Sequence, residues 1–277
     1  MQADTNKSAG SPALIIDAHA HIFPNKIAEK AVAGIGGFYD GLEMHCSGTA
    51  EDLIRSGTEA GITEFIVQSV ATVPGQVESI NNFISRAVKK YPDNLIGFAA
   101  IHPDYPDIEK EIDRAVSLGL RGIKLHPDFQ QFCIDDPKAM KIYEAAEGRL
   151  PVLIHTGDSR YQWSKPARLV KVLEAFPRLD VIAAHFGGWS EWDSAVSVLG
   201  GHRYGNLWTD CSSSLYAMSP EHAKRLIDAY GADRVLFGTD YPMWTASEEL
   251  KRFSEIALTE RECEMIFHEN AEKLLKL

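Results

Sequence analysis

The chain has 277 residues, of which 45% are hydrophobic and 24% are charged, and its formal net charge is −11. A chain of this length holds one large α/β domain or two small ones. The acidic balance, without a Lys/Arg-rich stripe, argues against a nucleic-acid partner. No apolar run approaches the ~18 residues of a membrane span, so no membrane partner is expected.

The first residues, MQADTNKSAGSP, are small and polar and lack the apolar core of a secretory signal. We expect residues 1–12 to form a frayed or disordered tail, followed by one catalytic domain over 13–277. The four cysteines are scattered without a CxxC pair: Cys46, Cys133, Cys211 and Cys263. This spacing is typical of reduced thiols and predicts a cytoplasmic location.

Eight short apolar runs alternate with helix-like stretches along the rest of the chain. The predicted strands cover 13–23, 62–71, 95–103, 121–127, 151–157, 180–188, 206–214 and 234–242. The amphipathic stretches cover 49–61, 77–92, 107–119, 137–148, 166–177, 219–231 and 259–277. Eight β-then-α units predict a single-domain (β/α)8 TIM barrel, not an open doubly wound sheet. The long, Gly-rich connection at about 24–48 is expected to be a loop over the site.

The first predicted strand contains the sequence IIDAHAH, in which Asp17, His19 and His21 are two residues apart. Alternate side chains of a strand share a face, so these three are expected to point the same way. Similar side chains stand at the ends of later strands: His155, His185 and Asp240. Because the carboxyl ends of barrel strands meet on the face that carries active sites, these groups predict a metal centre. Imidazole and carboxylate ligands suit Zn, Fe, Mn or Co better than Mg or Ca.

This pattern resembles the amidohydrolase superfamily over essentially the whole chain. HFGGW at 185–189 and GTDYP at 238–242 look most like its amidohydrolase-2 branch, which includes aminocarboxymuconate-semialdehyde decarboxylase, related aromatic-acid decarboxylases, hydratases and hydrolases. The resemblance implies one divalent ion held by His19, His21, His155 and Asp240, and the donor chemistry makes Zn²⁺ the first choice. It also implies that His185 is an acid/base group beside the ion, with a fifth-ligand role as the alternative. Asp240 would also accept a proton from metal-bound water.

Lys124 lies in the fourth predicted strand, within GIKLHP. Alternation turns Lys124 and His126 into the barrel mouth if Ile123 and Leu125 face the helices. An inward lysine is costly to bury without a partner. Three interpretations stay open: an ammonium that anchors the substrate, a carboxylated lysine that bridges two metals as in some superfamily members, and a structural salt bridge.

Side chains just past the strand ends are predicted to bind the substrate: Phe23, Lys124, His126, Arg160 and Trp189. Further pocket candidates are Gln68, His102, Asp158, Tyr161 and Trp244. The planar fork of Arg160 fits a carboxylate bidentately. Together with Lys124, Lys165 and a divalent cation, it would create a local positive potential. We therefore expect a small-molecule substrate with at least one carboxylate.

The leading hypothesis is a metal-dependent hydrolase that acts on a small amide, lactone or ester through a metal-activated water. The alternative is a non-oxidative decarboxylase of an aromatic or unsaturated acid on the same metal site. A metal-binding barrel without turnover is a third interpretation, against which the complete ligand set argues. The sequence identifies neither the substrate nor the oligomeric state, and a homo-oligomer is compatible with it.

Overall fold

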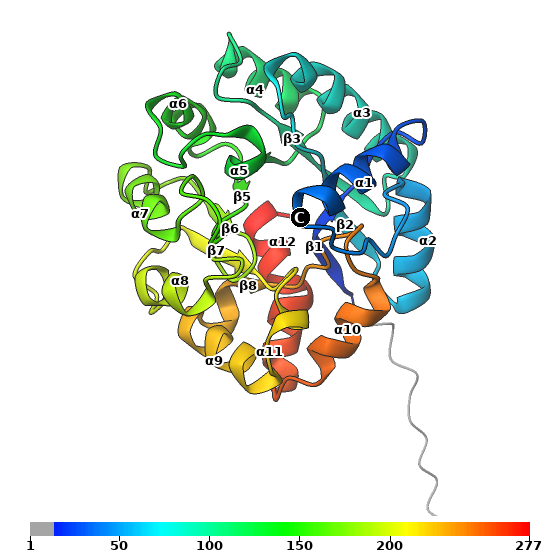
Figure 1. Ribbon diagram of the computed structural model, residues 1–277, viewed down its shortest axis with the longest axis vertical. Coiled ribbons are helices and arrows are strands. Elements are labelled where there is room, and N and C mark those ends of the chain that lie inside the picture. Colours follow the sequence, from blue (N-terminus) through cyan, green and yellow to red (C-terminus); the bar gives the residue numbers. More distant parts are fainter. Residues whose placement is uncertain (1–13) are drawn as a thin grey trace, which may run out of the picture.

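The computed structural model describes residues 14–277, which form a (β/α)8 barrel (Figure 1). Eight parallel strands follow one another around the sheet in chain order. Their bounds are β1 Ile16–His21, β2 Glu64–Gln68, β3 Leu95–Ala100, β4 Gly122–Leu125, β5 Val152–Ile154, β6 Val181–Ala183, β7 Leu207–Asp210 and β8 Val235–Leu236. The segment that begins at β8 joins β1 through hydrogen bonds from Ala18 N to Phe237 O and from Asp240 N to His19 O, both 2.8 Å. The predicted TIM barrel is confirmed.

Helices surround the strands, and most of them lie where the amphipathic stretches predict them. Their bounds are α1 Ala28–Phe38, α2 Ala50–Ala60, α3 Val77–Lys90, α4 Ile108–Ser117, α5 Pro127–Gln130, α6 Pro137–Ala146, α7 Pro166–Ala175, α8 Trp192–Leu199, α9 Pro220–Tyr230, α10 Ala246–Ser254, α11 Glu260–Glu264 and α12 Asn270–Leu275. The connection at about 24–48 is not simply a loop, because it contains α1. The tail expected at 1–12 lies outside the described residues. Within 14–277, no helix has the length and apolar character needed to cross a membrane.

Local sequence explains where α2 begins and ends. The side chain of Thr49 caps the helix by accepting a hydrogen bond from Asp52 N (3.3 Å). Gly61 follows the last turn with φ of 103°, a left-handed conformation that glycine adopts without strain. The helix lies within the amphipathic stretch predicted at 49–61.

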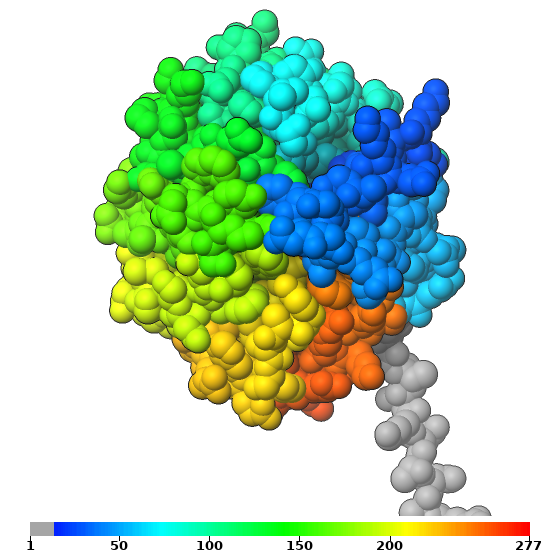
Figure 2. Space-filling model, viewed as in Figure 1, coloured from blue at the N-terminus to red at the C-terminus, as the bar shows by residue number. Residues whose placement is uncertain are grey.

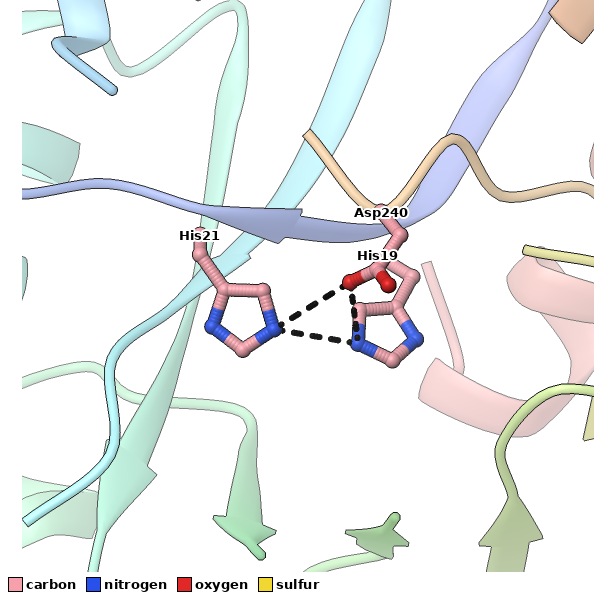
Figure 3. Close-up of side chains that lie close together, drawn as sticks. All are labelled: His19, His21 and Asp240. Atoms are coloured by element: carbon pink, nitrogen blue, oxygen red, sulfur yellow. Dashed lines mark hydrogen bonds and ion pairs between the residues drawn. The ribbon is translucent and has the colours of Figure 1, made fainter. Parts of the chain in front are cut away.

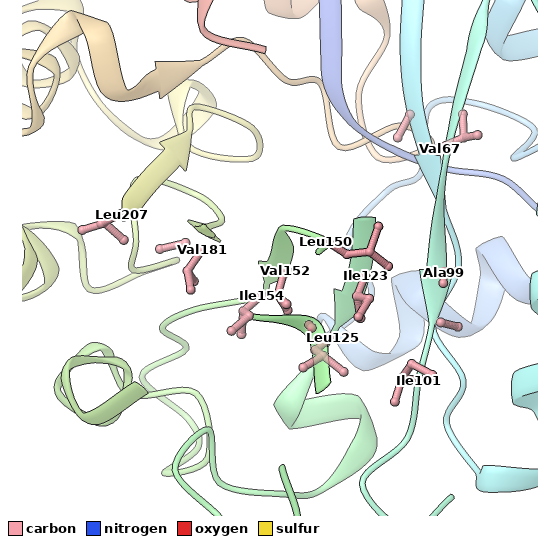
Figure 4. Close-up of a cluster of buried hydrophobic side chains, with 14 of the residues drawn as sticks. Val67, Ala99, Ile101, Ile123, Leu125, Leu150, Val152, Ile154, Val181 and Leu207 are labelled. Atoms are coloured by element: carbon pink, nitrogen blue, oxygen red, sulfur yellow. The ribbon is translucent and has the colours of Figure 1, made fainter. Parts of the chain in front are cut away.

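Two apolar layers stabilise the barrel. Outward-facing strand residues such as Ile123, Val152 and Ile154 pack in the layer shared with the helices (Figure 4). The inner layer includes Ile16, Ile66, Phe98, Leu153, Ile182, Trp208, Leu236, and Leu274 and Leu275 of α12. Arg121, which precedes β4, donates to Leu275 O (2.7 Å), so α12 closes the amino-terminal end of the barrel. The opposite end is left for the site.

An irregularity in β1 separates Asp17 from the two histidines of the same strand. After Asp17, which pairs with Phe65, β1 holds one residue more than β2. Phe65 belongs to the outer layer, and on that side Asp17 accepts hydrogen bonds from the Thr239 backbone N–H (3.0 Å) and hydroxyl (2.6 Å). The prediction that Asp17 shares a face with His19 and His21 is therefore wrong, because alternation holds only while the register is kept.

Candidate metal centre and active site

Three predicted ligands converge at the carboxyl end of the barrel (Figure 3). The Nε2 atoms of His19 and His21 lie 3.2 Å apart, and Asp240 Oδ1 lies 3.3 Å from the first and 3.5 Å from the second. Two ligand atoms that each lie about 2.0–2.1 Å from one tetrahedral ion are ~3.3 Å from each other, which matches these separations. These donors therefore fit a divalent transition-metal ion.

Asp210, the last residue of β7, orients His19. Its Oδ2 accepts a hydrogen bond from His19 Nδ1 (3.0 Å), which leaves the lone pair of that imidazole on Nε2, facing the other ligands. Its Oδ1 accepts from the backbone N–H groups of His185 (3.0 Å) and Ser212 (3.1 Å). Burial by itself raises the pKa of Asp210, but His19 and the hydrogen bonds outweigh burial and bring that pKa to about 2. Asp210 is therefore an ionised support for the ligand.

His185 follows β6 and lies beside the converging ligands. Its ring stacks on that of His19 with centroids 5.0 Å apart. Its Nδ1 donates to Ser212 O (2.9 Å), so Nε2 is the atom that can gain or lose a proton, 3.0 Å from His155 Nδ1. The backbone at both His185 (φ 61°) and Asp240 (φ 58°) is left-handed. Such strain costs roughly 1–3 kcal/mol per residue and gathers at functional sites.

His155, the fourth predicted ligand, lines the same cavity and belongs to a second group of donors, together with His126 and Asp128. Its ring stacks on His126 with centroids 3.9 Å apart, and its Nε2 lies 3.6 Å from Asp128 Oδ2. Within 14–277, His155 Nε2 and both oxygens of Asp128 are buried without a hydrogen-bond partner. Burial raises the pKa of Asp128 to about 7. The structure thus places the fourth ligand next to His185 and apart from the other three.

Lys124 points into the barrel, as the alternation along β4 predicts. Its side chain is buried, and its Nζ lies 2.9 Å from His19 Nε2. Burial lowers the pKa of this ammonium to about 8. No carboxylate of the described residues forms an ion pair with it, so the salt-bridge interpretation finds no support. The anchoring and carbamate interpretations both agree with its position beside the ligands.

A cavity of about 800 Å³ opens over these residues. Its floor consists of His19, His21, Lys124, His126, His155, His185 and Asp240. Its walls come from α1, from α3 and from the connection between β2 and α3, and they are mostly apolar. Phe23, predicted to bind the substrate, also lines it. Trp189 does not, and packs instead on Tyr39 with ring centroids 5.0 Å apart.

Arg160 does not line this cavity. Its Nε and Nη2 donate to the two oxygens of Asp158 (3.0 and 2.8 Å), and its Nη1 donates to Phe38 O (2.9 Å) and to Asp40 (2.8 Å). Four aromatic rings surround the guanidinium: those of Phe38, Tyr39, Tyr161 and Trp189. Arg160 therefore ties the end of α1 to the loop after β5, and a protein carboxylate already fills its fork.

The remaining candidates also lie away from the cavity lining: Gln68, His102, Asp158, Tyr161, Lys165 and Trp244. In contrast, three residues of the site are not identified by the sequence analysis: Asp128, Asp210 and Tyr39. The signal for Asp210 is its position at the end of the seventh strand, equivalent to that of the ligands. Tyr39, whose hydroxyl lies 3.1 Å from His126 Nε2, follows α1 and carries no such signal.

A parallel barrel that gathers imidazoles and a carboxylate where its strands end has the arrangement typical of metal-dependent barrel enzymes. The amidohydrolase family model matches residues 16–277, so the chain belongs to the amidohydrolase family. The resemblance stated from the sequence is confirmed.

Several relatives are decarboxylases. The 2-amino-3-carboxymuconate-6-semialdehyde decarboxylase of Dictyostelium discoideum is 24% identical, with 87% of each chain covered. Decarboxylase OrsB of Emericella nidulans is 27% identical over a match that spans 46% of each chain, less than half of that relative. The solved 5-carboxyvanillate decarboxylase of Novosphingobium aromaticivorans, a complex with manganese and 4-hydroxy-3-methoxy-5-nitrobenzoic acid, has a TM-score of 0.75 at 19% identity, with all of both chains covered. This last likeness supports the fold.

Proposed function

We propose that the chain is a metal-dependent, non-oxidative decarboxylase of an aromatic or unsaturated carboxylic acid. The observation that carries the proposal is the convergence of His19, His21 and Asp240 on the floor of a mostly apolar cavity, with His185 beside them. The donor set agrees equally with a hydrolase, which the sequence puts first. The activities named for the relatives favour decarboxylation.

The metal would be held by His19, His21 and Asp240, with His155 as the fourth ligand that the family pattern implies. When bound, a divalent ion supplies a Lewis acid that polarises and orients a substrate oxygen. Imidazole and carboxylate donors accept both Mn²⁺ and Zn²⁺. The manganese in the carboxyvanillate decarboxylase complex makes Mn²⁺ the first candidate and Zn²⁺ the second.

The protein residues have distinct tasks in this reaction. As the bond to the carboxylate breaks, the carbon left behind must gain a proton, and His185 is placed to deliver it from Nε2 because its Nδ1–H is held by Ser212 O. Lys124, buried at the floor, stabilises the anionic oxygens of the substrate. The rings of Phe23 and Phe129 line the cavity and exclude water from the reacting carbon.

Hydrolysis of a small, carboxylate-bearing amide, lactone or ester is the second candidate. One observation favours it: Asp240 Oδ2 accepts a hydrogen bond from the Ser213 hydroxyl (2.6 Å), while Oδ1 faces the histidines. A carboxylate held in this way can accept the proton of an attacking water.

The two candidates are separated by the product. Mn²⁺-loaded protein is incubated with hydroxybenzoates, lactones and amides, and CO₂ is measured together with the organic product. We expect CO₂ from an aromatic acid, and His185→Asn should lower kcat by about 10²–10⁴ while keeping the metal. His222→Asn, on α9 and outside the cavity, is the control. A released carboxylate or amine without CO₂ would instead support hydrolysis, and loss of metal in His185→Asn would make His185 a ligand.

The metal assignment has its own test. In the double variant His19→Ala/His21→Ala, the metal content measured by mass spectrometry should fall from about one equivalent per chain to background. The far-UV circular dichroism should be unchanged, because the apolar layers lie beneath the site. The control is His222→Ala/His268→Ala, two histidines of the outer helices. A double variant that retains its metal would contradict the assignment.

A further inference from the structure

The cavity extends away from the metal ligands as a groove between α1 and α3. Ile27, Ala31 and Ile35 line it from the α1 side, and Ile80 and Phe83 line it from α3. Both helices lie on the side of the barrel that carries β1 and β2 (Figure 1). In the space-filling view, the blue segment containing α1 reaches the centre of this face and meets the green segment there (Figure 2). Ile27, Lys30 and Arg86 of the cavity lining are exposed, so the groove leads from the barrel mouth to the surface.

The groove gives the site more room than a small acid needs. A volume of about 800 Å³ lies in the upper part of the range for pockets that bury a drug-sized ligand, roughly 300–1,000 Å³. A single hydroxybenzoate ring on the floor would leave the space between the helices unfilled. Ile27, at the rim, is 50% exposed. An exposed apolar side chain that continues an apolar groove is suited to contact a ligand.

The outer edge of the groove is cationic. Lys30 of α1 and Arg86 of α3 both line the cavity, and both are exposed. Unlike Arg160, neither forms an ion pair with another residue of 14–277. Two uncompensated cations at the rim attract an anion even though the net charge of the chain is −11, because distant charges are screened.

We infer that the substrate is an acid whose reacting end carries an apolar arm, and that this arm ends in a second anionic group. The reacting end lies on the floor, the arm lies between α1 and α3, and the terminal anion lies between Lys30 and Arg86. The identity of the reacting end rests on the proposed function. The fit of an apolar, anion-terminated arm depends only on the groove.

Gly34 of α1 permits a test that leaves the floor intact. It lines the cavity, and a Cβ placed on it meets no atom within 4 Å, so a side chain added there starts in open space. Gly34→Leu therefore fills part of the groove. Gly37→Leu is the matched control, because Gly37 lies on the same helix, is equally open and does not line the cavity. Both changes raise helix propensity by the same amount.

Binding is measured by calorimetry on the Mn²⁺-loaded full chain, with hydroxybenzoates that carry ω-carboxyalkyl chains of increasing length. In the wild type and Gly37→Leu, affinity should rise about threefold to fourfold per methylene, the effect of burying one such group. In Gly34→Leu this gain should disappear, while the parent hydroxybenzoate binds equally well to all three proteins. Lys30→Met/Arg86→Met should weaken the acid-terminated chains at least tenfold more than their methyl esters.

The inference of an apolar arm would be overturned if affinity did not change with chain length, or if the two glycine variants had equal effects. If Lys30→Met/Arg86→Met lowers the affinity for acids and for esters equally, the inference of a terminal anion would be overturned. If the parent ring neither binds nor loses CO₂, the proposed function fails. The groove is then tested with simple dicarboxylic acids of increasing length, which require no ring and should show the same dependence on Gly34.

Discussion

Asp210 contacts two histidines at once, since one oxygen accepts from the His19 ring at Nδ1 and the other accepts from the His185 backbone N–H. Asp210→Asn removes the charge and offers an N–H where His19 needs an acceptor. We expect the affinity for Mn²⁺ to fall about 10–100-fold, the usual effect of losing such a support. Competition with a chelator measures it. Asp180→Asn, which removes the charge of a carboxylate that accepts from Trp208 Nε1 far from the site, should leave metal affinity unchanged. If the two variants bind Mn²⁺ equally tightly, Asp210 does not orient His19 for metal binding.

Some single residues can be predicted from the sequence because their positions follow from strand ends. His19, His21 and Asp240 are of this kind. Asp17 is not, since its face depends on a register shift against β2 that the sequence of β1 does not reveal. Arg160 is not either, because the partners that fix its guanidinium on α1 lie 120 and more residues away.

Helix α10 carries a buried acid in a stretch that also contains exposed charged residues. Glu249 is fully buried, and Arg252 donates to its Oε1. Burial raises the pKa of this carboxyl to about 7. The folded chain therefore keeps a proton that the unfolded chain has already released, so this group reduces stability as the pH rises from about 4.5 to about 7.

Glu249→Gln should remove that loss. Relative to the wild type, the variant should gain roughly 2–3 kcal/mol in free energy of unfolding between pH 4.5 and pH 8. Urea denaturation at the two pH values measures the change. Glu255→Gln, at the exposed end of the same helix, should track the wild type. The same difference between variant and wild type at both pH values would contradict the assignment.

Most elements with a clear period are predicted from the sequence. Strands and amphipathic helices alternate as expected, but α1, α8 and α10 lie outside the predicted helical stretches. In α1, the alanines, glycines and scattered apolar residues give no polar face. The strands predicted from the sequence extend beyond the observed ones at their carboxyl ends, and this has a physical reason. The run at 234–242 reads as one strand, but regular pairing stops after Leu236 and the backbone turns left-handed at Asp240, which directs the ligand inward.

The molecule as a whole separates stability from chemistry. Leu274 of α12 packs in the inner layer at the end away from the metal ligands. Leu274→Ala should cost about 2–4 kcal/mol of unfolding free energy, because the barrel cannot collapse around the missing side chain. Metal content should stay the same. The control is Leu277→Ala, which removes an exposed leucine two residues after the helix. Metal loss in Leu274→Ala under folded conditions would show that the two ends are coupled.

The position of α1 has a consequence for how this barrel could be re-engineered. One wall of the groove comes from a single connection, about 24–48, whereas the ligands lie on the strands themselves. The length of substrate that fits and the metal ligands are therefore encoded in different parts of the gene. Replacing this connection would change the length of substrate that fits and leave the metal ligands unchanged. Such a graft has one requirement. It must retain a carboxylate at the position of Asp40, because Arg160 otherwise keeps a single hydrogen-bond acceptor on this connection, the carbonyl of residue 38.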